Sequence, residues 1–289
     1  MNELPKSEGG ISGRGTRPYK DLYIYLLNGV VEELYESHFG VAFVGNWVEV
    51  DSSFLFFGQP ADKEVDRLLG SCPDLELIET HHFTYEQWQG GGLEPFRIDD
   101  FVVVPPWEKE GSEETGIRIL LDPGVVFGNG LHPTTRDCLK ALSYAKRHRP
   151  FRRVLDLGTG TGVLALAAAL LGAERVLGVD INPLCVKTAI SNVELNGLSD
   201  RIHMKDGPAE NFVADSADLV VANIHHEVIV RLMDGGGFRD AERFIVSGLF
   251  RSQFRDVKTR LEMRQYRVLR EWDHDMTWFT LLAEKNSGV

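Results

Sequence analysis

Residues 154–162 read Val-Leu-Asp-Leu-Gly-Thr-Gly-Thr-Gly, an apolar stretch that runs into three alternating glycines. Glycine tolerates positive φ and lets the backbone approach a ligand closely. The apolar residues Val163–Leu171 that follow have the length of a helix, so the stretch predicts a strand, a tight turn and a helix. A dinucleotide-binding fingerprint of the form GxGxxG would need glycine at position 163, where this chain has valine. The spacing therefore disfavours a dinucleotide as the ligand of this turn.

Two acidic residues lie near the turn. Asp156 precedes the glycines, and Asp180 follows the next predicted strand, Arg175–Val179. A carboxylate beside the turn would repel a pyrophosphate, whereas S-adenosylmethionine carries an ammonium and a sulfonium. In this architecture a carboxylate at the place of Asp180 accepts hydrogen bonds from ribose hydroxyls. These features favour S-adenosylmethionine as the cofactor, with a purely structural turn and a helix-capping Asp180 as the alternative. The cofactor-binding residues predicted from this turn are Asp156, Gly158, Gly160, Gly162 and Asp180.

Two further polar residues follow predicted strands. Asp206 comes after Arg201–Met204, where such folds hold the adenine amino group, although Asp206-Gly207 is equally good turn chemistry. Asn223 comes after Leu219–Ala222, and ligands of open α/β sheets lie beyond the carboxyl ends of strands. Its amide oxygen could accept a hydrogen bond from the ammonium of the cofactor or from a substrate amine. We therefore predict cofactor contacts for Asp206 and Asn223, and a catalytic, amine-orienting role for Asn223.

Strands and helices alternate from residue 153 onwards, which predicts a mostly parallel sheet covered on both faces. The last two strands, Arg267–Glu271 and Trp278–Ala283, leave no room for a helix between them and must be antiparallel. A doubly wound α/β sheet closed by an antiparallel hairpin is the class I S-adenosylmethionine-dependent methyltransferase fold. We assign it to residues 95–289. The other predicted elements are a strand at Arg243–Val246 and helices at Pro183–Asn196, Glu227–Met233 and Ser252–Met263.

The N-terminal part of the chain predicts a smaller unit in the order β-α-β-β-α-β, which fits an α+β ferredoxin-like domain. We assign residues 1–82 to it, and residues 83–94, with Gly90-Gly91-Gly92, to a linker. Phe101–Val104 and Ile117–Leu121 are predicted to form a hairpin that opens the second domain. The predicted strands of the small domain are Asp21–Leu27, Val41–Val50, Ser53–Phe57 and Leu75–Thr80, and its predicted helices are Val30–His38 and Ala61–Leu69.

Composition restricts the classes of partner. The 289 residues carry a formal net charge of −12, which argues against direct nucleic-acid binding and fits a basic protein partner. Three cysteines without metal-ligand spacing indicate a reducing compartment and predict no metal site. No basic-then-apolar leader is present, and the longest apolar run is far too short to span a membrane. We therefore expect a cytoplasmic protein without a membrane partner.

The segment 122–135, Asp-Pro-Gly-Val-Val-Phe-Gly-Asn-Gly-Leu-His-Pro-Thr-Thr, resembles the bacterial PrmA family, which methylates the eleventh protein of the large ribosomal subunit. The resemblance continues through residues 154–162, 179–181, 220–224 and 247–249, and covers most of residues 95–289. It implies an S-adenosylmethionine-dependent protein N-methyltransferase that acts on lysine side chains or an α-amine of a large-subunit ribosomal protein. The small domain would then recognise the substrate. The alternative is a paralogue that methylates another protein or a small amine. The family's cofactor contacts fall on Thr135, Gly158, Asp180 and Asn223.

His132 is the second catalytic candidate, because the acceptor amine must lose a proton and His132, His225 or water could take it. Alternatively, His132-Pro133 forms a rigid turn, with Thr134 or Thr135 as the N-cap of a helix over Arg136–Ala145. The chain also departs from the family at Asn129 and Leu131, where threonines are usual, and at His225-His226-Glu227, where small apolar residues are usual. Neighbours on a helix point in different directions, which argues against a shared metal ion. We predict that the two histidines shape the acceptor pocket, with solvent-facing residues as the alternative.

Overall fold

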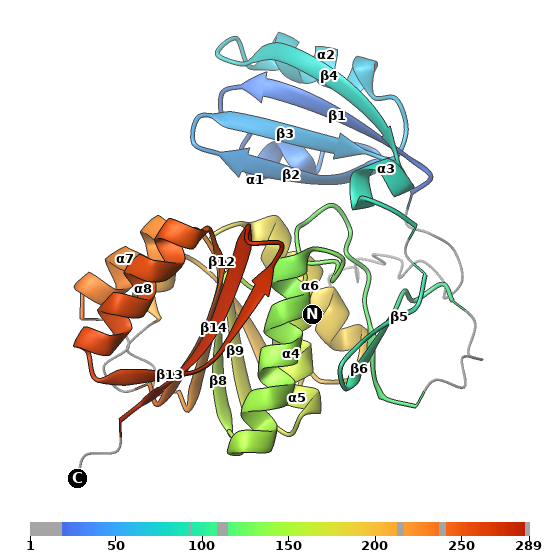
Figure 1. Ribbon diagram of the computed structural model, residues 1–289. Coiled ribbons are helices and arrows are strands. Elements are labelled where there is room, and N and C mark those ends of the chain that lie inside the picture. Colours follow the sequence, from blue (N-terminus) through green and yellow to red (C-terminus); the bar gives the residue numbers. More distant parts are fainter. Residues whose placement is uncertain (1–18, 93, 109–114, 213–216, 237–240, 287–289) are drawn as a thin grey trace, which may run out of the picture.

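The computed structural model describes residues 19–92, 94–108, 115–212, 217–236 and 241–286. Figure 1 shows a small domain above a larger one, with the short helix α3 (Tyr85–Gln89) between them. No helix in the described part of the chain is long and apolar enough to cross a membrane.

The small domain has the predicted order β-α-β-β-α-β. Its sheet runs β2-β3-β1-β4, and every neighbouring pair is antiparallel. The first helix has only four residues, against nine predicted, because it buries no side chain and its N-cap Glu32 makes no capping hydrogen bond. The last strand continues to Thr84, which pairs with Asp21. The elements are β1 (Asp21–Asn28), α1 (Glu33–Glu36), β2 (Phe43–Glu49), β3 (Ser52–Phe57), α2 (Asp62–Ser71) and β4 (Glu76–Thr84).

The two faces of the small sheet have different neighbours. Alternate side chains of a strand point to opposite faces, so Tyr25 and Leu27 pack against the side of α2, in one buried cluster with Val65 and Leu68. Leu22, Ile24 and Phe56 belong to a second buried cluster, which also contains Val125, Val126, Leu184 and Cys185 of the large domain. The small domain is therefore joined to the large one by a shared apolar cluster.

The large domain is a seven-stranded sheet in the order β10-β9-β8-β11-β12-β14-β13. Only β14 runs against its neighbours, which confirms the predicted doubly wound sheet with a terminal antiparallel hairpin. Helices α4 and α5 cover one face and α7 and α8 the other (Figure 1). The strands are β8 (Arg153–Leu157), β9 (Arg175–Asp180), β10 (Ile202–Asp206), β11 (Leu219–Asn223), β12 (Arg243–Leu249), β13 (Tyr266–His274) and β14 (Trp278–Lys285); the helices are α4 (Pro133–His148), α5 (Val163–Leu170), α6 (Pro183–Leu195), the 3-10 turn η1 (Ala209–Asn211), α7 (His226–Asp234) and α8 (Arg251–Met263).

The predicted hairpin at the entry to the large domain is wrong. β6 (Phe101–Val104) and β7 (Ile117–Leu120) are neighbours, but they are parallel. The connection between them has about a dozen residues, which is long enough for a parallel crossover. The antiparallel partner of β6 is β5 (Phe96–Ile98), reached through a tight turn in which Asp99 has a φ of 48°.

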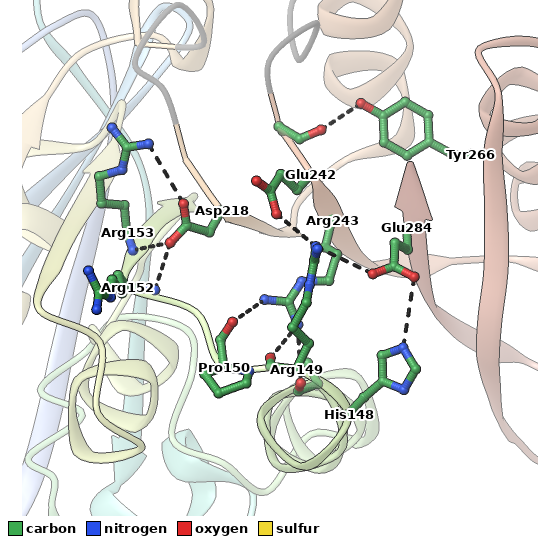
Figure 2. Close-up of polar contacts among 12 residues, drawn as sticks. His148, Arg149, Pro150, Arg152, Arg153, Asp218, Glu242, Arg243, Tyr266 and Glu284 are labelled. Atoms are coloured by element: carbon green, nitrogen blue, oxygen red, sulfur yellow. Dashed lines mark hydrogen bonds and ion pairs between the residues drawn. The ribbon is translucent and has the colours of Figure 1, made fainter. Parts of the chain in front are cut away.

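Helix α4 spans the large domain along β12. At its first turn, the carbonyl of Thr134 accepts a hydrogen bond from Ser247 near the end of that strand. At its other end, the fully buried Arg243 donates to the carbonyls of Ala145, Arg149 and Pro150 at 3.1, 2.6 and 3.0 Å (Figure 2). The Ala145 carbonyl also accepts from the Arg149 N–H, whereas Arg149 and Pro150 follow the last residue of α4, where a helix leaves carbonyls without a helical donor. Arg243 thus fixes one end of α4, and the other end lies at the carboxyl edge of the sheet.

Candidate active site

The glycine turn between β8 and α5 requires glycine for two reasons. Gly158, Gly160 and Gly162 all have positive φ, at 71°, 53° and 82°. A Cβ atom on Gly158 would lie 2.1 Å from Cγ2 of Ile224, and one on Gly160 would lie 2.4 Å from the carbonyl oxygen of Phe127. The turn is therefore packed between the residue after Asn223 and the segment before α4.

Asp180 ends β9 beside this turn. One carboxylate oxygen accepts a hydrogen bond from the Gly160 N–H at 2.9 Å, and the other accepts one from the Asn182 N–H at 3.0 Å. Burial raises the pKa of Asp180, while these backbone donors oppose the rise. The cap of α6 is Asn182, which accepts from the Leu184 N–H. Capping of α6 therefore falls to Asn182, and Asp180 is held at the edge of the sheet beside the glycine turn.

Asp206 lies at the same edge of the sheet, because it pairs in parallel register with Asp180. Its side chain is exposed, and the following Gly207 N–H donates to the Asp180 carbonyl at 2.9 Å. Ile181, which sequence reasoning missed, has 75% of its surface exposed directly after Asp180. An exposed isoleucine beside two carboxylates offers an apolar surface to a flat ring. Its signal in the sequence was an apolar residue placed just beyond a strand.

Asp156 lies beneath the turn and has no accessible surface. It accepts a hydrogen bond from the Thr159 hydroxyl at 2.7 Å, and its other oxygen has no hydrogen-bond partner among the described residues. Burial raises its pKa to about 7. In this geometry Asp156 supports the turn from inside.

The first turn of α4 differs from the prediction. The helix begins at Pro133, and the N-cap is His132, whose Nδ1 accepts a hydrogen bond from the Thr134 N–H at 3.3 Å. Neither threonine is the N-cap, because the imidazole already supplies the acceptor. Thr135 is only 1% exposed, and its hydroxyl oxygen has no hydrogen-bond partner in the described residues. A buried hydroxyl without a partner is costly, so this atom suits a polar ligand group.

His132 is held between two aromatic rings, those of Phe127 and Trp278, each 5.3 Å away and edge-on. Burial lowers its pKa, and the nearby His274 lowers it further. A neutral imidazole whose Nδ1 accepts a hydrogen bond carries its proton on Nε2. The lone pair that a general base needs is then used in capping, and this geometry favours His132 as a hydrogen-bond donor.

Asn223 ends β11, in register with Ser247 of β12 and one residue past the pair Ala222 and Leu157. Its side chain is half-buried and makes no hydrogen bond with any described residue. The carboxyl ends of β8, β9, β10 and β11 therefore meet with a glycine turn, two carboxylates and a free amide at one edge.

The two neighbouring histidines do not both face this edge, so the prediction for them is wrong in part. His226 bonds to Asp256 of α8 at 2.9 Å, and Asp256 also accepts from Arg260. His226 therefore joins α7 to α8. His225 is exposed at the N-cap of α7, two residues after Asn223. Of the two histidines, it is the one that remains a candidate for contact with the methyl acceptor. The described residues contain no group of three or more His, Cys, Asp and Glu side chains arranged to hold a metal ion.

A cleft of about 600 Å³ lies between the open face of the small sheet and the segment before α4. The small sheet and α3 contribute Trp47, Phe54, Phe56 and Trp88, and the large domain contributes Phe127. One carboxylate, Glu49, is also present. The cleft reaches His132 and Pro133, so it extends from the small domain to the first turn of α4, which also contains Thr135. Its other lining residues are Gln89, Gly90, Val125, Val126, Gly128, Asn129, Leu131, His132 and Pro133.

Comparison with known proteins agrees with this arrangement. Residues 73–286 match the family model described as ribosomal protein L11 methyltransferase (PrmA). The chain is similar to the ribosomal protein L11 methyltransferase of Clostridium botulinum (36% identity over 72% of this chain and 67% of that one) and to that of Aquifex aeolicus (33% identity over 77% and 86%). The relative from Geobacillus kaustophilus is 37% identical, over 62% of this chain and 59% of its own length. A solved ribosomal protein L11 methylase from Lactobacillus delbrueckii subsp. bulgaricus superposes with a TM-score of 0.58 and 28% identity, over 67% of this chain and 99% of that one.

Proposed function

The chain belongs to the ribosomal protein L11 methyltransferase (PrmA) family, and we propose that it transfers the methyl group of S-adenosylmethionine to a lysine side chain or an α-amine of that ribosomal protein. Membership of this family confirms the resemblance drawn from residues 122–135 and the class I methyltransferase fold. The observation that carries the proposal is the gathering of Asp180, Asp206 and Asn223 with the glycine turn at one edge of the sheet, together with an aromatic cleft that runs from the small domain to His132 at the start of α4.

The residues at the sheet edge fit the cofactor. The Asp180 carboxylate, held by the Gly160 N–H beside the turn, would accept from the ribose hydroxyls, and the buried Thr135 hydroxyl would donate to the methionine carboxylate. Gly158 and Gly160 allow the turn to pack against Ile224 and Phe127, which fixes its place beside Asp180. Asp206 and Ile181 would contact the adenine, and Asn223 the ammonium. Asp156 and Gly162 would act from below, by holding the turn in shape.

When bound, S-adenosylmethionine supplies a methyl group on a positively charged sulfur. The protein must hold an amine lone pair in line with that group and exclude water, which together can contribute several kcal/mol. A lysine amine has an ordinary pKa of about 10.4, which burial beside a positive charge lowers. The amide oxygen of Asn223 would orient the amine, and the Nε2–H of His132 would donate a hydrogen bond at the mouth of the cleft.

The small domain suits a basic protein substrate. Residues 19–82 contain twelve Asp and Glu against three Lys and Arg. Opposite charge speeds the encounter of two proteins and orients them. The aromatic lining of the cleft would pack along the methylene groups of the acceptor lysine while its amine reaches the sheet edge.

Methyl transfer from labelled S-adenosylmethionine tests this proposal. The purified ribosomal protein, intact large subunits and a cell lysate are incubated separately with the enzyme, and the labelled residues are identified by mass spectrometry. We expect label on amines of the ribosomal protein. Label on another protein or on a small amine, with none on the ribosomal protein, would establish instead a paralogue whose altered residues Asn129, Leu131 and His225 select a different acceptor.

A further inference from the structure

The segment 122–131 is held on one side by α3 and the start of the small domain. The Gly124 carbonyl accepts two hydrogen bonds, from the Tyr19 hydroxyl at 2.7 Å and from the Gln89 amide at 2.8 Å. The indole of Trp88 donates to the Val125 carbonyl at 3.2 Å. Gln89 is only 6% exposed, although it is a polar residue. The segment 122–131 is therefore hydrogen-bonded to α3, the helix that directly follows the last strand of the small domain.

On its other side the same segment holds the glycine turn. The Thr161 N–H donates to the Phe127 carbonyl at 3.1 Å, and the Thr161 hydroxyl donates to the Gly128 carbonyl at 2.8 Å. The buried amide of Asn192 adds a bridge, since its nitrogen donates to the carbonyls of Asp122 and Thr161. A displacement of residues 122–131 would thus move the turn proposed to hold the cofactor.

Asn129 completes the attachment to α3. Its amide nitrogen donates to the Gln89 backbone carbonyl at 2.8 Å and to the Gln89 side-chain oxygen at 3.1 Å. Its amide oxygen accepts from the Leu131 N–H at 2.9 Å. A hydroxyl group carries one proton and cannot make both donations to Gln89. Asn129 therefore ties the segment to α3 more firmly than the threonine that the resemblance leads us to expect at this position.

We propose that Gln89 and Asn129 are positioning residues that couple the placement of the protein substrate to the cofactor site. Substrate in the cleft would contact Trp88 and Gln89 on α3 as well as Phe127 and Asn129 on the segment. A bound substrate would hold the segment 122–131 and α3 in one relative position. The hydrogen bonds from Thr161 to Phe127 and Gly128 would then fix the glycine turn relative to the segment. Because binding free energies are linked reciprocally, the substrate then raises the affinity for the cofactor, and the cofactor raises the affinity for the substrate equally. The inference rests on the proposed function.

The test measures the dissociation constant of S-adenosylhomocysteine, which cannot react, by calorimetry with and without the saturating protein acceptor. The ratio of the two constants is the coupling. We expect a ratio of at least about fivefold in the unaltered enzyme and a ratio near one in Gln89→Ala. Asn129→Thr, which restores the residue usual in the family, should also lower the ratio. The double variant should fall no further than Gln89→Ala, because the two residues act as one pair.

Gln87→Ala is the matched control. Gln87 lies in the same short helix, and its hydrogen bonds are those of the capping box with Thr84. It should lower stability and keep the ratio, which separates coupling from general weakening of α3. An unchanged ratio in both Gln89→Ala and Asn129→Thr overturns the inference, as does a ratio of one in an unaltered enzyme that methylates its acceptor. Failure to label the ribosomal protein refutes the proposed function alone, and the ratio is then measured with the acceptor found in lysate.

Discussion

Thr135→Val should make the cofactor-free protein more stable and the cofactor weaker. The side chain is 1% exposed, and its hydroxyl oxygen has no hydrogen-bond partner among the described residues. A buried polar group left unpaired costs about 1–3 kcal/mol, and valine replaces the hydroxyl by a methyl group of the same shape. Unfolding without ligand should therefore occur about 2–4 °C higher for each kcal/mol gained.

Cofactor affinity should move in the opposite direction. A hydrogen bond to a charged carboxylate contributes about 1.5–3 kcal/mol, which corresponds to roughly a 10- to 150-fold weaker dissociation constant when it is lost. Calorimetry with S-adenosylmethionine measures the affinity, and thermal and urea unfolding of the ligand-free protein measure the stability. A rise in the stability of the ligand-free protein together with a fall in cofactor affinity distinguishes a hydroxyl that binds the ligand from one that only fills space in the core.

Thr135→Ser provides the matched control. Serine keeps the hydroxyl and loses a buried methyl group, so affinity should stay close to that of the unaltered protein while stability falls by about 1 kcal/mol. The reasoning is refuted if Thr135→Val lowers stability and leaves the affinity for S-adenosylmethionine unchanged.

Four other substitutions test single parts of the site and its support. Asp180→Ala should weaken S-adenosylmethionine binding by at least about tenfold in calorimetry, because two charge-assisted hydrogen bonds to the ribose are lost; unchanged affinity would remove the ribose assignment. Burial raises the pKa of Asp156 from 3.8 to about 7. Between pH 3.8 and about 7 this carboxyl therefore binds a proton in the folded protein that it lacks in the unfolded chain. The free energy of unfolding should fall as pH rises through that range. Asp156→Asn should abolish this fall, at most about 1.4 kcal/mol per pH unit, in urea unfolding at a series of pH values. His132→Asn keeps an N-cap acceptor and should leave the shape of the kcat–pH profile unchanged, whereas loss of the fall in rate on the acidic side of the profile would make His132 the base. Arg243→Met removes the side-chain donor of the Arg149 and Pro150 carbonyls, while the Ala145 carbonyl keeps the Arg149 N–H; it should cost about 2 kcal/mol or more in urea unfolding, and a smaller loss would show that other groups satisfy those two carbonyls.

Local patterns were sufficient for most of the large sheet. The strands Phe101–Val104 and Arg153–Leu157 lie where the sequence predicts them, because each is a short apolar run bounded by turn-forming residues. The antiparallel end of the sheet also follows from the sequence, since the loop between β13 and β14 is too short for a crossover. The direction of β7 could not be predicted in this way. Its connection is long enough for either orientation, and the pairing is decided by contacts far apart in the chain.

The N-terminus of α4 shows a second limit of sequence patterns. Threonines are common N-caps, and two of them follow a His-Pro pair here. Proline is favoured at the first position of a helix, which shifts the start to Pro133 and gives the cap to His132. The two threonines then lie inside the first turn, where Thr135 is buried. Side-chain geometry therefore changed the interpretation of both the histidine and the threonine.

The residues that join the two domains carry no local signal at all. Gln89 and Asn129 are ordinary polar residues in the sequence, and they bond to each other 40 positions apart, while Gln89 also reaches Gly124, 35 positions away. The division into residues 1–82, 83–94 and 95–289 stays a prediction, and the apolar cluster that contains Leu22, Ile24, Val125 and Val126 crosses it. Because those apolar side chains are buried only when the domains are together, a change in the small domain alters the packing of the segment beside the glycine turn. Substrate recognition and cofactor binding in this chain are therefore expected to respond together to substitutions at the domain contact.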